Sequence, residues 1–185
     1  QLDEAIEEMR LAVSLDPLSP VFNYWLSRLL YFSRQLDEAV EEAHRSIDLD
    51  AGPNSFRPRL VLGQCQLLRE RPEPALRDFE EAYRTSGVVS AKSFVARAHA
   101  AAGRTSEARR ILDELEAGDD YVRSEFMAAA WASLGELDHA FRALERAYSD
   151  RSAGLIYLHV DPSYDPLRDD PRYRSLVERI GLKTG

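Results

Sequence analysis

Four histidines and a single cysteine are the side chains best suited to bind a metal or act as a nucleophile. His44, His99, His139 and His159 are far apart, and none has a second histidine or a cysteine at the spacing of a zinc site. Cys65 has no disulfide partner, and its place beside apolar helix positions predicts a buried, unreactive thiol. We therefore expect neither a zinc site nor a cysteine nucleophile.

Carboxylates offer a second kind of chemistry. Four of them crowd the C-terminal region: Asp161, Asp165, Asp169 and Asp170. They lack the central glycine and final glutamate of a calcium loop, so they are predicted to cap helices and turns. Adjacent pairs such as Glu41–Glu42 and Glu80–Glu81 are predicted on solvated helix faces, where general acid–base catalysis has no cleft. Phosphate-loop and nucleophile-elbow motifs are also missing from the sequence. We expect no enzyme, no cofactor and no metal.

Charge and composition narrow the class of partner. The formal net charge is −8, and the sequence has no basic stripe that would neutralise phosphates, so nucleic acid is not expected to bind this segment directly. No apolar run approaches the 18 or so residues of a membrane span, and no signal peptide is visible at Gln1. With the lone cysteine, these observations predict a cytoplasmic protein without membrane contact.

A repeat predicts the helices that must position any functional side chain. Residues 1–8 return as residues 35–42 with seven of eight residues identical, at a spacing of 34. Small residues at fixed offsets, which let helices approach closely, lie within and after both copies. In the first copy they are Ala5 and Ala12 with Met9 and Pro17, and in the second Ala39, Ala43 and Ser46, with Ala51 in place of the proline.

This pattern resembles the tetratricopeptide repeat (TPR), a helix-turn-helix unit of 34 residues. The resemblance implies an all-α fold, a TPR-type α-α superhelix in which antiparallel helix pairs form a right-handed solenoid. The predicted array covers residues 1–149, with a partial unit at 1–17 and full units at 20–50, 55–87, 89–117 and 121–149. Gly63 is expected where two helices cross closely. Residues 150–185 are predicted to form a loop and a capping helix that starts at Asp170-Pro171 and ends at Gly181.

The C-terminal part carries a narrower resemblance. Residues 131–148, rich in small and aromatic residues, and the Asp-Pro-punctuated residues 160–173 are similar to the C-terminal TPR regions of bacterial multidomain regulators. Those regions follow winged-helix transcriptional regulators, adenylate or guanylate cyclases, or serine/threonine kinases. The resemblance implies a sensory or scaffolding part of a larger signalling or regulatory protein.

The TPR resemblance also implies that the first helix of each pair lines a concave groove for a protein or peptide. Carried over position by position, the partner-binding residues are Tyr24, Arg28, Tyr31, Phe32, Arg57, Leu60, Gln64, Ser93, Arg97, Val122 and Glu125. Aromatic rings beside arginines suit an extended peptide with an acidic group. The lysines and asparagines of the family's clamp for two carboxylates are absent from these positions.

Three alternatives remain open. Tyr31 and Phe32 are groove residues or simply pack against a preceding part of the protein. The module is a protein-interaction scaffold, or it senses a ligand in a closed apolar pocket between Tyr24, Tyr31 and Arg57 and controls an attached DNA-binding, cyclase or kinase domain. The N-terminal helix stays half-covered, so either a preceding part of the protein or another subunit packs on it, and in the second case Ile6, Met9 and Val13 predict a homo-oligomer.

Overall fold

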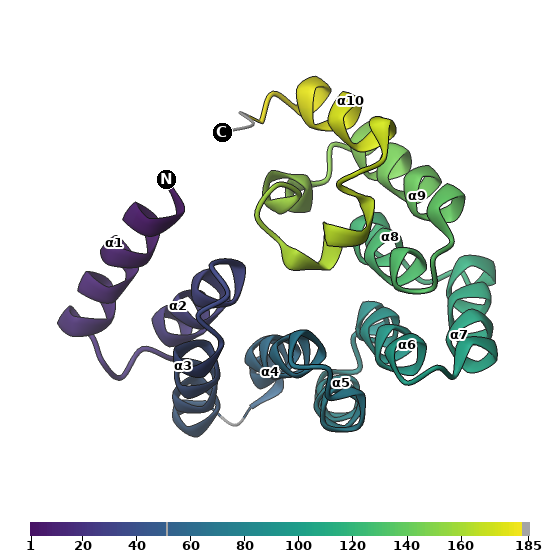
Figure 1. Ribbon diagram of the computed structural model, residues 1–185. Coiled ribbons are helices and arrows are strands. Elements are labelled where there is room, and N and C mark those ends of the chain that lie inside the picture. Colours follow the sequence, from purple (N-terminus) through teal and green to yellow (C-terminus); the bar gives the residue numbers. More distant parts are fainter. Residues whose placement is uncertain (51, 183–185) are drawn as a thin grey trace. The chain divides into compact units, whose positions relative to one another are not determined.

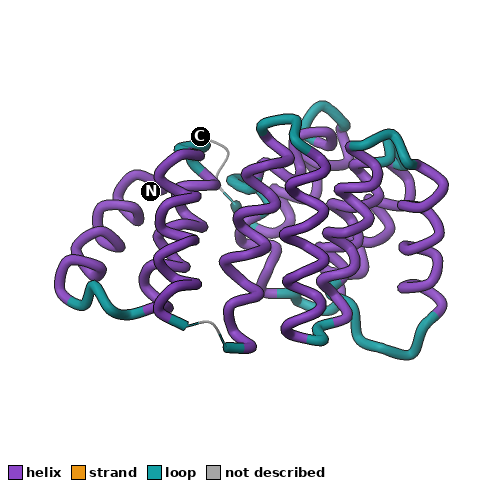
Figure 2. The backbone as a smooth tube through the Cα atoms, turned by 90° about the horizontal axis from the view of Figure 1, so that it is seen from below, coloured by secondary structure: helices purple, strands orange, loops and turns teal. Residues whose placement is uncertain are grey.

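A computed structural model describes residues 1–50 and 52–182 (Figure 1). Across these residues the backbone forms helices and connecting turns without a β-strand (Figure 2), which confirms the all-α fold. Ala51, the predicted substitute for the repeat's proline, and the last three residues of the predicted tail lie outside the described residues. The chain divides into two compact units, residues 1–91 and residues 92–185. None of the described helices has the length and apolar character needed to cross a membrane.

The first unit contains five α-helices and two short 3₁₀ turns among its described residues. They are α1 (Leu2–Leu15), α2 (Pro20–Phe32), α3 (Leu36–Leu49), η1 (Pro53–Ser55), α4 (Phe56–Leu68), α5 (Pro72–Ser86) and η2 (Val89–Ala91). Helices α2 and α3 pack as one hairpin and α4 and α5 as the next, while α1 packs on α2 and α3 on α4 (Figure 1). The repeated octapeptide starts a helix in the same way both times, with Gln1 and Gln35 as the N-caps.

The small residues of the repeat form the contacts inside these hairpins. Ala39, Ala43, Ala75 and Ala82 are all fully buried. At Gly63 a Cβ atom would lie 2.6 Å from Cδ1 and 2.7 Å from Cζ of the buried Phe79 ring, so only a glycine lets α4 approach α5 this closely. The predicted close crossing at Gly63 is confirmed.

Helix α1 buries more of its apolar stripe than the sequence led us to expect. Ile6 is buried, and Met9 and Val13 are half-buried. The large apolar side chains of α1 that remain well exposed are instead Leu11 and Leu15. Packing on α2 therefore covers much of the surface on which the expected self-association was based, and the homo-oligomer stays a prediction.

The second unit repeats the hairpin arrangement and adds a C-terminal segment. Its elements are α6 (Lys92–Ala101), α7 (Thr105–Ala117), α8 (Ser124–Ser133), α9 (Leu137–Ser149), η3 (Ala153–Tyr157), η4 (Pro162–Leu167) and α10 (Pro171–Ile180). Helices α6 and α7 pair, as do α8 and α9. The repeat positions Ala108, Leu112, Ala140, Leu144 and Ala147 are buried, as the alignment of the repeats predicts.

The C-terminal helix begins and ends where the sequence places it. The Asp170 carboxylate accepts a hydrogen bond from the backbone N–H of Arg172 at 2.9 Å, Pro171 is the first helical residue, and Gly181 closes the helix with φ +80°. Helix α10 packs on α9 through its apolar face, and Arg179 of α10 forms an ion pair with Glu145 of α9 at 2.7 Å. It therefore covers the last helix pair of this unit.

All four hairpins turn through a left-handed residue at the same place. Gly103 and Gly135 occupy it in the second unit, with φ near +75°. In the first unit the same conformation is adopted by Arg34 and Glu70, which lack glycine's freedom at positive φ. The hairpin geometry is therefore kept where the sequence signal for the turn is lost.

Candidate functional site

A pocket of about 200 Å³ lies in the first unit, between the start of α2, the end of α3 and the start of α4. Its lining is part apolar and part polar: Pro20, Val21, Tyr24, Ser46, Asp50, Asn54, Ser55, Arg57 and Pro58. Tyr24 and Arg57, which the sequence assigned to a partner surface from two different hairpins, share this pocket. Tyr31, the third side chain of the expected closed pocket, is not part of its lining.

Hydrogen bonds between side chains and the backbone hold the pocket walls in place. The Ser46 hydroxyl of α3 donates to the carbonyl of Pro20 at 2.7 Å, which fixes the end of α3 against the start of α2. The Asn23 amide donates to the carbonyl of Ser19 at 2.7 Å and stabilises the turn that leads into α2. Asp50 accepts the backbone N–H of Gly52 at 2.8 Å, which directs the connection toward α4. The pocket is therefore built on ordered helix ends.

The polar groups of the pocket are incompletely paired. Arg57 is exposed, its guanidinium lies 5.7 Å from the centroid of the Phe56 ring, and it forms no ion pair with any described residue. Asp50 also lacks an ion pair within the described part of the chain, although it lines the same pocket. Ser55 is only 2% exposed, and its hydroxyl finds no hydrogen-bond partner among the described residues. Buried hydroxyls are normally paired, so the Ser55 hydroxyl is an exception among the side chains that line this pocket.

The other predicted residues of the first unit lie mostly inside it. Tyr31 is 1% exposed, Phe32 and Leu60 are buried with it, and Gln64 is half-buried. The rings of Tyr31 and Phe32 pack against each other with centroids 5.7 Å apart. Both rings are covered within this chain, so they are not exposed as an open groove would require, and their packing against a preceding part of the protein stays a prediction.

Arg28 has a packing role beside the pocket. Its guanidinium lies 5.4 Å from the Trp25 ring and 5.3 Å from the Phe32 ring, and it donates a hydrogen bond to the Tyr24 hydroxyl at 3.1 Å. Stacking of this kind holds a guanidinium in place while leaving part of it accessible. Arg28 therefore orients Tyr24 at the pocket wall.

The predicted partner residues of the second unit are also largely covered. Ser93 is fully buried, Arg97 is 6% exposed with its guanidinium 5.7 Å from the Phe94 ring, and Val122 is half-buried. Glu125 is 1% exposed. These four side chains do not form an open surface comparable to the pocket of the first unit.

Glu125 is covered by the C-terminal segment of the chain. Its carboxylate accepts a hydrogen bond from the Ser152 hydroxyl at 2.9 Å and forms an ion pair with Arg123. Its backbone carbonyl accepts a hydrogen bond from the Tyr164 hydroxyl at 3.0 Å. Gly154 contributes no side chain here, and a Cβ atom on it would lie 2.7 Å from Nη2 of Arg123. Glu125 thus attaches the tail to α8, a structural role that its position in the repeat did not reveal.

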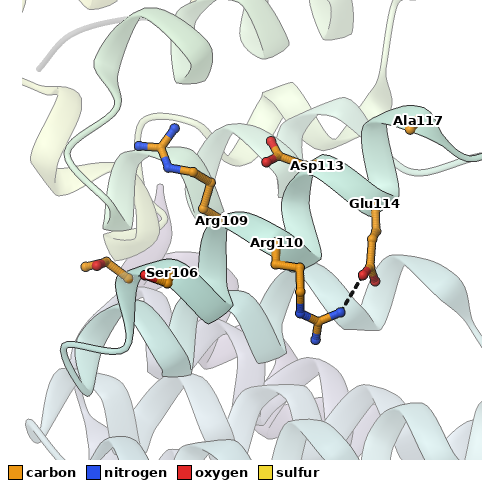
Figure 3. Close-up of a pocket in the computed structure, with 7 residues that line it drawn as sticks. Ser106, Arg109, Arg110, Asp113, Glu114 and Ala117 are labelled. Atoms are coloured by element: carbon orange, nitrogen blue, oxygen red, sulfur yellow. Dashed lines mark hydrogen bonds and ion pairs between the residues drawn. The ribbon is translucent and has the colours of Figure 1, made fainter.

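A second hollow, open to solvent, follows the outer face of α7 (Figure 3). It is lined only by residues of that helix: Thr105, Ser106, Arg109, Arg110, Asp113, Glu114 and Ala117. Its arginines are already neutralised, because Arg110 pairs with Glu107 and Glu114 and Arg109 pairs with Glu136. This surface offers a ligand little that is unpaired.

Other reactive side chains have structural explanations. Cys65 is fully buried, as predicted, and burial raises the pKa of its thiol to about 12, which disfavours the thiolate. Burial also raises the pKa of Asp78 to about 6, against the opposing effects of His44, Arg59 and Arg77. His99 accepts a hydrogen bond from Nε of Arg104 at 2.9 Å.

The C-terminal aspartates also act locally. Asp161 caps η4 by accepting the backbone N–H of Ser163 at 2.8 Å, and Asp165 forms an ion pair with Arg168 at 2.8 Å. Asp161 and Asp170 thus have the helix-capping role predicted from the sequence. Within residues 1–50 and 52–182, no three histidine, cysteine or acidic side chains gather as a metal site would require.

No protein-family model matches the chain, and neither does any curated protein.

Proposed function

We propose that this chain is a non-catalytic, cytoplasmic protein-interaction module of the TPR type, which binds a peptide or a partner domain. The likeness of its C-terminal part to regulator TPR regions supports a place within a larger bacterial signalling or regulatory protein. The main support is the pocket of the first unit, which is lined both by Tyr24 and by the exposed Arg57, a guanidinium without an ion pair among the described residues. Tyrosine and arginine are the side chains that most often dominate protein interfaces.

The pocket suits one anchoring side chain of a partner. Apolar contacts come from Pro20, Val21 and Pro58, and the Tyr24 ring adds a rigid wall that loses little entropy on binding. A volume of about 200 Å³ is below the range of roughly 300–1,000 Å³ typical of sites for drug-sized molecules. An extended peptide that inserts one residue here and continues along α2 fits this size.

The test is selection of short random linear peptides by phage display on the whole chain. The selected peptides are then compared on the parent, on Arg57→Glu and on Arg71→Glu. Arg71 is an exposed arginine in the turn between α4 and α5, so its reversal is a matched change of charge away from the pocket. Arg28 is unsuitable for this test because it packs on Trp25 and Phe32.

We expect the selected peptides to bind Arg57→Glu at least about tenfold more weakly than the parent, because a hydrogen bond to a charged group contributes about 1.5–3 kcal/mol. Their affinity for Arg71→Glu should equal their affinity for the parent. If no peptide is enriched, or if both variants bind as the parent does, the first unit is not the partner surface.

A second function, a ligand-sensing module that controls an attached DNA-binding, cyclase or kinase domain, is favoured by the buried and unpaired Ser55 hydroxyl. A peptide side chain has no special need for this group, whereas an enclosed small molecule would satisfy it. Thermal unfolding of the chain in the presence of small metabolites tests this function, because a ligand of the folded state raises the melting temperature. A melting temperature unchanged by every compound would refute it.

A further inference from the structure

Two charges of opposite sign face the same pocket and do not neutralise each other. Arg57 comes from the first turn of α4, and Asp50 follows the last residue of α3. Neither forms an ion pair with the other or with any other described residue. Opposite charges that are in contact usually pair directly. Arg57 and Asp50 line one pocket without an ion pair between them, which suits a ligand that carries both charges.

We propose that this pocket binds a free α-amino acid with a small apolar side chain. Its carboxylate pairs with the Arg57 guanidinium, and its ammonium group pairs with the Asp50 carboxylate. The Ser55 hydroxyl donates a hydrogen bond to the ligand and so gains the partner it lacks within the described chain. The side chain packs on Val21 and Pro58.

The charge pattern discriminates against ligands with a single charge. A simple carboxylate would meet Arg57 favourably but would also be repelled by Asp50, and an amine would experience the reverse. Only a zwitterion satisfies both groups, and unpaired charges in a binding site are a strong source of specificity.

The volume of the pocket limits which zwitterions can bind. About 200 Å³ accommodates a single amino acid but not a larger metabolite. Arg57 and Asp50 are the only charged residues of this lining, so no further charged group is left to pair with an acidic or basic side chain of the ligand. A short aliphatic side chain therefore matches the lining best.

This inference goes beyond peptide binding, because it assigns a role to Asp50 and Ser55, which peptide anchoring does not require. An amino acid in the pocket would compete with a peptide side chain for Arg57. Occupancy of the pocket by the amino acid would then reduce partner binding, which gives the module a means of responding to a metabolite.

The experiment uses isothermal titration calorimetry of the whole chain with L-valine. Two blocked compounds, N-acetyl-L-valine and L-valinamide, each lack one of the two charges and require no mutation. Three variants accompany them: Arg57→Gln, Asp50→Asn and the control Arg71→Gln. Asparagine at position 50 keeps an oxygen that can accept the Gly52 N–H, so this variant is expected to retain the fold.

Saturable binding of L-valine is expected, weakened at least about tenfold for each blocked compound and for each pocket variant, and unchanged for Arg71→Gln. Absence of L-valine binding would overturn the proposal, as would equal binding of N-acetyl-L-valine or an unaltered affinity in Asp50→Asn. The peptide proposal is judged separately, because selected peptides that lose affinity on Arg57→Glu but not on Asp50→Asn would support it even if L-valine does not bind.

Discussion

Replacing Gly63 by alanine tests the packing on which the first unit depends. In an ordinary helix this change stabilises by about 0.5–1 kcal/mol, because glycine has more backbone entropy to lose. Here the new methyl group would lie within 2.7 Å of three atoms of the Phe79 ring, and that ring is fully buried. Overpacking of this kind costs about 1–3 kcal/mol. We therefore expect Gly63→Ala to lower the free energy of unfolding by about 1–2 kcal/mol.

The sign of the effect should depend on Phe79. In a Phe79→Leu background the ring is gone, so Gly63→Ala should become neutral or stabilising by up to about 1 kcal/mol. Urea unfolding followed by far-ultraviolet circular dichroism measures the parent, both single variants and the double variant, and the cycle isolates the coupling between the two positions. If Gly63→Ala stabilises the parent, or if its effect is the same in both backgrounds, the close crossing of α4 and α5 does not constrain the fold.

Three further predictions concern other positions. Gly154→Ala places a methyl group against Arg123 and Glu125 and should cost about 1–3 kcal/mol of unfolding free energy, with loss of protection against limited proteolysis after residue 150. Because burial raises the pKa of Asp78 from 3.8 to about 6, the folded state holds a proton that the unfolded state releases between about pH 4 and pH 6. The contribution of Asp78 to stability therefore falls as pH rises through this range, and Asp78→Asn should stabilise the chain at pH 7 but not at pH 4 in urea unfolding; equal effects at both values would contradict the sign. Gly103→Ala, at φ +75°, should lower the free energy of unfolding by about 1–2 kcal/mol, and a stabilising effect in the same assay would refute the left-handed assignment.

Much of the fold could be predicted because the repeat fixes which residues are small. Alanines at equivalent positions, such as Ala39, Ala75 and Ala140, are each fully buried, and the last helix starts after Asp170, where local sequence signals place it. Helical periodicity and caps act within a few residues, so a sequence expresses them directly.

The candidate site could be predicted only in part. Tyr24 and Arg57 were found from their places in the repeat, but Asp50 and Ser55 were missed because they belong to the connection between α3 and α4. That connection departs from the repeat spacing, and nothing local states which helix end it will approach. Its polar and proline-containing composition was the available signal.

The sequence did not predict the burial of Glu125 in the second unit. Glu125 shares the repeat position of exposed groove residues, yet the C-terminal segment covers it through Ser152 and Tyr164. These two contacts join residues that are 27 and 39 positions apart in the sequence. No periodic pattern in the sequence describes contacts of this kind.

The single thiol provides a way to time the opening of the first unit. Cys65 is inaccessible and its pKa is raised to about 12, so a thiol reagent reacts with it only after α4 separates from its neighbours. Since the sequence has no other cysteine, the rate of modification reports on residues 1–91 alone, whatever the second unit does. Alkylation followed by mass spectrometry can thus measure the opening equilibrium of one half of the chain under native conditions, without an introduced label.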